Sequence, residues 1–76
     1  MRENVAVDPA QTGKNIRKIV KYAGMKADDL AEICDCSLVA VYAWYSGRNV
    51  PSVDNLVLMS NAFGISIDDI VARKAV

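Results

Sequence analysis

The sequence contains no histidine and only two cysteines, Cys34 and Cys36, which flank Asp35. A tetrahedral metal site needs further ligands, and no second cysteine pair completes one. Two cysteines this close in the chain also make a poor disulfide. Because unpaired cysteine is mostly buried in proteins, we expect two small apolar side chains at a helix end rather than a metal or redox site.

Long apolar runs are missing as well. Every uninterrupted apolar stretch is far shorter than the roughly 20 residues that a membrane-spanning helix needs, so no membrane segment is expected. The N-terminus has no apolar signal core, which predicts a cytoplasmic protein. The chain also lacks a glycine-rich phosphate loop and a nucleophile with a nearby base. We therefore expect neither an enzyme nor a cofactor, and no small-molecule ligand is evident.

Excess charge of either sign is absent too, since nine basic residues balance nine acidic ones. A nucleic-acid-binding domain normally shows a basic patch, so the distribution of charge matters more than its sum. Cations cluster in the first third of the chain at Lys14, Arg17, Lys18, Lys21 and Lys26. Acidic residues follow at Asp28, Asp29, Glu32 and Asp35. This pattern fits a phosphate-facing helix or an ordinary solvated face, and charge alone favours the solvated face.

The 76 residues correspond to one domain, and 53% apolar content excludes disorder by composition. Apolar residues at helical spacing, with capping residues between them, predict five short helices. Their expected ranges are 11–22, 27–34, 37–45, 52–63 and 67–72. Helix starts are assigned to Thr12, Ser37, Ser52 and Ser66, and helix ends to Gly24, Gly47 and Gly64.

Both ends of the chain fall outside this helical pattern. Residues 1–10 are expected to form an arm in which Pro9 stops any strand. Residues 11–72 would form the domain and residues 73–76 a tail. Apolar residues continue between Ile70 and Val76, beyond the last predicted helix, and Val5–Val7 in the arm is apolar as well. Two alternatives remain open: the tail packs in a dimer interface, or it pairs as a short strand with Val5–Val7.

The second and third predicted helices have helix-turn-helix spacing. Such a motif needs a short turn, small apolar residues between the two helices and a free face on the second helix. Ala31 permits close approach, and Asp35 lies in the turn, where it tolerates a positive φ better than most residues. The expected apolar contacts are Leu30, Cys34, Cys36, Val41 and Trp44.

From Gly24 to Val71 the chain resembles the Cro/lambda-repressor (Xre) helix-turn-helix family without a gap. The resemblance rests on two groups of residues. The first is Gly24-Met25, Leu30-Ala31-Glu32, Ser37, Val41 and Trp44, and the second is Gly47, Pro51-Ser52, Leu56 and 63–70. It implies an all-α, compact five-helix lambda-repressor-like domain. It also implies a transcription regulator that binds double-stranded DNA in the major groove through residues 37–45, usually as a homodimer on palindromic operators.

Three residues depart from the family's usual pattern. Ala27 stands where the second helix usually begins with glutamine, Asp35 where the turn usually has glycine, and Tyr45 where glutamate often follows the tryptophan. By resemblance, the base-facing positions are Leu38, Val39, Tyr42 and Ala43. The expected phosphate contacts are Lys14, Arg17, Lys26, Ser37, Ser46 and Arg48.

The predicted recognition helix is apolar where base readout usually needs polar side chains. Leu38, Val39 and Ala43 offer no side-chain hydrogen bond, but they can contact thymine methyl groups. The Tyr42 hydroxyl can bond a phosphate, which fixes register without reading sequence. In an alternative interpretation, the apolar surface of the third helix is a protein-contact surface. In that alternative, the helix-turn-helix is a scaffold for protein–protein interaction, and the third helix contacts a partner.

Overall fold

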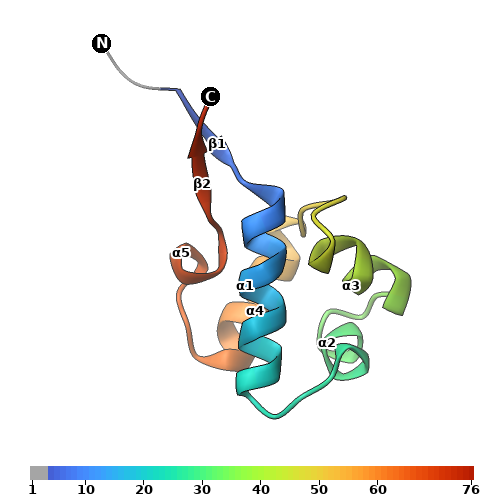
Figure 1. Cartoon of the computed structure of the whole chain (residues 1–76). Helices are drawn as coiled ribbons and strands as arrows, with labels where there is room; N and C mark the ends of the chain where they lie inside the picture. The colour runs from blue at the N-terminus through green and yellow to red at the C-terminus, as the bar shows by residue number, and fades with distance from the viewer. Residues whose placement is uncertain (1–3) are drawn as a thin grey trace.

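The computed structural model describes residues 4–76, so residues 1–3 of the predicted arm lie outside the described residues. Five helices and a two-stranded sheet follow one another along the chain. They are β1 (Val5–Val7), α1 (Pro9–Tyr22), α2 (Ala27–Ile33), α3 (Leu38–Tyr45), α4 (Val53–Phe63), α5 (Ile67–Ile70) and β2 (Arg73–Ala75). In Figure 1, α1 runs through the middle, with α2 and α3 on one side and α5 on the other. The expected all-α five-helix fold is confirmed, with the small sheet added to it.

The start of α1 differs from the prediction. Asp8 rather than Thr12 caps this helix, because the Asp8 carboxylate accepts a hydrogen bond from the Gln11 N–H at 3.1 Å. Pro9 occupies the first turn, where its missing N–H costs nothing. Thr12 lies inside the helix, 1% exposed, and its hydroxyl accepts from the Ala72 N–H at 3.0 Å. The prediction was wrong because Pro9 was taken only as the end of a strand.

The other predicted helix starts are confirmed. Ser37, Ser52 and Ser66 each accept a hydrogen bond from the backbone N–H three residues further on, which satisfies a donor that the helix leaves free. The last helix ends at Ile70, earlier than the predicted Ala72. Its end is early because Val71 is extended and Ala72 instead bonds to the N-terminal part of the chain.

The core lies among the five helices, and its fully buried side chains come from every one of them. They include Ile16, Leu30, Val41, Met59 and Ile70. The axis of α1 passes very close to the end of α3. A Cβ on Gly13 would clash with the Trp44 carbonyl and lie 2.8 Å from the Tyr45 carbonyl oxygen, so no larger residue fits there without a shift.

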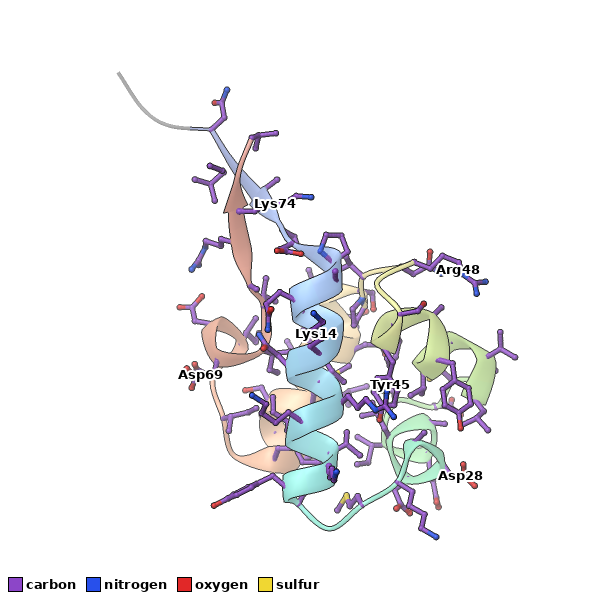
Figure 2. The ribbon with its side chains drawn as sticks, in the orientation of Figure 1. Lys14, Asp28, Tyr45, Arg48, Asp69 and Lys74 are labelled. Atoms are coloured by element: carbon purple, nitrogen blue, oxygen red, sulfur yellow. The ribbon has the colours of Figure 1, made fainter. Side chains whose placement is uncertain are left out.

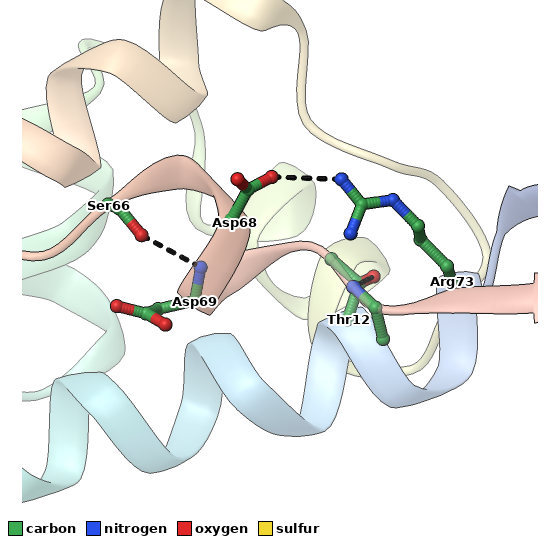
Figure 3. A network of polar contacts seen from close by, with 6 residues as sticks. Thr12, Ser66, Asp68, Asp69 and Arg73 are labelled. Atoms are coloured by element: carbon green, nitrogen blue, oxygen red, sulfur yellow. Dashed lines mark hydrogen bonds and ion pairs between the residues drawn. The ribbon is translucent and has the colours of Figure 1, made fainter.

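The two ends of the chain meet in an antiparallel ribbon. β1 pairs with β2 in the register Val5 to Ala75, Ala6 to Lys74 and Val7 to Arg73. Of the two alternatives predicted for the tail, the structure has the strand pairing. The ribbon extends beyond the end of α1 (Figure 1). At its base, the Arg73 guanidinium pairs with the Asp68 carboxylate at 2.9 Å, next to the Ser66 cap (Figure 3).

None of the helices within residues 4–76 is both long enough and apolar enough to cross a membrane.

Candidate nucleic-acid interface

The turn between α2 and α3 holds the two helices in a fixed relation. Asp35 has a φ of 50°, the only positive φ of a non-glycine residue in the described part of the chain, as its place in the turn predicts. Behind it, the Cys36 N–H donates to the Ala31 carbonyl at 2.9 Å. Leu30 and Val41 then meet in the core. The motif therefore buries one face of α3 and leaves the opposite face free.

The free face of α3 is apolar. Leu38 is 37% exposed, Val39 73% and Tyr42 54%. Residues three and four positions apart share one side of a helix, so these three side chains form a single surface. We call Leu38, Val39 and Tyr42 the α3 patch. The exposure of this patch shows that not all the apolar side chains of the third helix belong to the core.

Ala43 does not belong to this surface. It was expected to face the bases, but it is only 4% exposed. The loop after α3 folds back at this residue, where the Arg48 and Asn49 N–H groups both donate to the Ala43 carbonyl. Only three of the four predicted base-facing side chains are therefore accessible.

A cationic groove lies between α1 and α3, next to the α3 patch, with a volume of about 540 Å³. Its polar and aromatic lining consists of Arg17, Lys21, Lys26, Tyr42, Tyr45 and Ser46, and no carboxylate lines it. In residues 4–76 the one ion pair joins Arg73 to Asp68, so the cations of the groove carry no paired carboxylate. A groove of this composition favours anions, because unpaired cations and a hydroxyl can all donate to phosphate oxygens.

Tyr45 connects the groove to the recognition helix. The Arg17 guanidinium lies 5.9 Å from the centre of the Tyr45 ring, and the Tyr42 ring meets that ring edge-on at 6.1 Å. Figure 2 shows Tyr45 between α1 and α3. Burial raises the pKa of the Tyr45 hydroxyl, the Arg17 charge lowers it and Tyr42 raises it again, with a net rise. Tyr45 is therefore a protonated, uncharged phenol, and the contact of its ring with the guanidinium holds Arg17 beside the α3 patch.

The predicted phosphate contacts divide into two groups. Arg17, Lys26 and Ser46 line the groove together. Lys14 lies one turn from Arg17 on the same exposed side of α1. Arg48 is exposed in the loop after α3 and points away from α1 (Figure 2), while the Ser37 hydroxyl caps α3. The cations therefore do not all flank the α3 patch on one side.

Sequence reasoning missed two groove residues. Lys21 was counted among the cations of the first helix but not assigned to phosphate, and Tyr45 was noted only as a departure from the family pattern. The signal for Lys21 was available, because it follows Arg17 by four residues and helical positions four apart share a face. The signal for Tyr45 was not, because its role depends on how closely α1 approaches α3.

The two cysteines lie at the end of α2 and in the turn. Cys34 is buried, and burial together with the neighbouring Cys36 raises the pKa of its thiol to about 11. Burial and the Asp35 charge also raise the pKa of Cys36. Both thiols are therefore protonated near neutral pH, which disfavours nucleophilic and metal-binding chemistry. Within residues 4–76 no three groups of the histidine, cysteine or carboxylate type gather to hold a metal.

Comparison with known families identifies the family to which this helix-turn-helix geometry belongs. The helix-turn-helix family model HTH_3 matches residues 14–70, from the first cation of the α1 surface to the last core residue of α5. The chain belongs to the helix-turn-helix family. The resemblance to the Xre and lambda-repressor type is thereby confirmed, and it extends through all five helices.

Two solved structures resemble this helix-turn-helix protein. A transcriptional regulator from Listeria innocua is 28% identical with a TM-score of 0.75, and the match covers 80% of this chain and 57% of that one. The restriction-modification controller protein C.AhdI from Aeromonas hydrophila is 19% identical, also with a TM-score of 0.75. That match covers 83% of this chain and 96% of the other, and it shows the fold alone. No match was found among curated proteins. The family model supports a DNA-binding helix-turn-helix domain.

Proposed function

We propose that this protein binds double-stranded DNA as a homodimeric transcription regulator, with α3 in the major groove. The observation that carries the proposal is the groove of unpaired cations directly beside the exposed face of α3. Phosphate contacts position a protein on the duplex, and a helix lying in the major groove reads the base edges. In this structure the cations for phosphate contacts and the helix for the major groove lie on adjacent elements.

The phosphate contacts in this proposal come first from Arg17, Lys21 and Lys26, with the Ser46 hydroxyl as a further donor. Lys14 extends this surface along α1, and Arg48 and Ser37 contact the backbone at the two ends of α3. The α3 patch faces the bases, where Leu38 and Val39 contact thymine methyl groups. Since no side chain of the patch except Tyr42 can hydrogen-bond, we expect weak preference for A·T-rich sites rather than stringent readout.

Selection from a random-sequence DNA pool at several salt concentrations tests this proposal. An A·T-rich motif should be enriched, and affinity should fall as salt rises because each neutralised phosphate releases counterions. In Arg17→Gln the slope of log affinity against log salt should become shallower by about 0.9. Arg73→Gln is the matched control, because Arg73 is a surface cation already paired with Asp68, and its slope should stay unchanged.

The exposed α3 patch also supports a second candidate, a protein-interaction module. Three neighbouring apolar side chains on a free helix face are typical of protein contacts. Absence of any enriched motif, together with affinity that does not respond to salt, would favour this candidate over DNA binding. The cytoplasmic location expected from the sequence stays a prediction.

A further inference from the structure

The ribbon formed by β1 and β2 has an incomplete architecture. All six of its residues are exposed, and each strand has one edge without a partner in the described part of the chain. A two-stranded ribbon is marginally stable in water by itself. An open edge also presents free N–H and C=O groups, which pair readily with another strand.

The two edges of this ribbon differ in how they are protected. β2 carries Arg73 and Lys74, and charged residues of this kind normally discourage pairing of an edge strand. β1 is Val5-Ala6-Val7, with no charge, no proline and no bulge between its ends. The unprotected edge is therefore the one on β1.

The backbone of β1 shows which groups reach this edge. The Asp8 N–H donates to the Ala72 carbonyl at 2.8 Å, and the Asn4 carbonyl accepts from the Val76 N–H at 3.0 Å. Backbone N–H and C=O groups alternate in direction along a strand, so those of residues 4, 6 and 8 point toward β2. The N–H and C=O groups of Val5 and Val7 consequently point outward to the open edge.

We propose that β1 pairs antiparallel with β1 of a second copy, on a two-fold axis through Ala6. In this register Val5 of one copy lies opposite Val7 of the other, and each such pair exchanges two N–H···O=C bonds. The result is a four-stranded sheet in which four valines share one face and two small alanines meet at the axis. This inference rests on the homodimer of the proposed function and names its interface.

Antiparallel pairing of β2 with β2 of a second copy is disfavoured. A two-fold axis through Lys74 would place two ammonium groups directly opposite each other, and like charges in that position are destabilising. A second copy thus fits the β1 edge by symmetry and by charge, and it does not fit the β2 edge.

Oligomeric state measured by sedimentation without DNA tests the proposal. The intact chain should have twice its 8.3 kDa mass. Val5→Pro removes an outward N–H without touching the bonds between β1 and β2, and proline is tolerated where the N–H faces solvent. It should reduce the mass to that of the monomer. Ala75→Pro is the matched control, because Ala75 pairs with Val5 and directs its own N–H to the β2 edge. It should remain dimeric.

Three results would overturn the interface: a monomeric intact chain, a dimer that survives Val5→Pro, or a dimer lost only in Ala75→Pro. The second would direct attention to exposed apolar side chains on α4, such as Val53. Amide hydrogen exchange of the unaltered chain gives an independent readout. Exchange at Val5 and Val7 should slow as protein concentration rises, whereas exchange at Arg73 and Ala75 should not. Because no DNA is present, failure of the DNA-binding proposal would leave both results unchanged.

Discussion

The inner and outer faces of α3 carry the same class of side chain in opposite environments. Val41 and Trp44 on the inner face are buried in the core, whereas Val39 and Tyr42 on the outer face are exposed. The inner face stabilises the fold by removing apolar area from water. The outer face leaves most of Val39 and about half of Tyr42 in water, where this apolar area is free for a ligand. Apolar character alone therefore does not distinguish core from binding surface on this helix.

The comparison is tested most strongly by truncating one side chain on each face. Trp44→Ala should lower the free energy of unfolding by about 3–5 kcal/mol, because it removes a large buried side chain. Val39→Ala should change it by less than about 0.5 kcal/mol but weaken selection of the A·T-rich motif. Urea unfolding of both variants, with the DNA pool selection, makes the measurement. Equal losses of stability in the two variants would contradict the division of α3 into two faces.

A second test addresses the close contact that positions the inner face. Gly13→Ala should cost about 1–3 kcal/mol of stability, because its Cβ meets the Trp44 and Tyr45 carbonyls at the end of α3. The adjacent Lys14→Ala, which alters an exposed position of α1, should cost less than about 0.5 kcal/mol. Thermal unfolding of the pair checks this. If Gly13→Ala proves neutral, α1 and α3 do not approach as closely as described.

The start of α3 separates stability from DNA binding. Ser37→Ala removes the cap on the Ala40 N–H and should cost about 1 kcal/mol. Ser37→Asp keeps a capping oxygen, so stability should be retained, but its carboxylate should repel phosphate and lower DNA affinity. Chemical unfolding and DNA titration of both variants are required. Unchanged DNA affinity in Ser37→Asp would remove Ser37 from the phosphate contacts.

The smallest effect at neutral pH concerns Cys34, which packs in the same core cluster as Val41 and Trp44. Its pKa is raised in the folded chain from 9.0 to about 11, so above pH 9 the unfolded chain loses this proton first. The contribution of Cys34 to stability should therefore be constant below pH 9 and be lost between pH 9 and 11. Cys36 and Tyr45, whose pKa values are also raised, act in the same direction. Cys34→Ala should show a smaller alkaline loss, and an equal loss would exclude Cys34 as a cause.

Local chemistry explains why most of the fold was predictable. Serine caps at residues 37, 52 and 66, and the positive φ at Asp35, depend on neighbours within a few positions. The start of α1 was missed because Asp8 and Pro9 suit both a strand end and a helix start. The burial of Ala43 was missed because exposure on a helix depends on what the rest of the fold packs against it, which helical periodicity does not encode.

The sequence by itself determined the five helices, the serine caps of three of them, the helix-turn-helix spacing and the cationic side of α1, because each follows from periodicity or from contacts close in the chain. Only the tertiary structure decided which apolar residues of α3 remain exposed, that Tyr45 holds Arg17 beside them, and that the two chain ends form a ribbon with an open β1 edge. These features depend on contacts between distant segments, and such contacts exist only once α1, α3 and the termini have packed together.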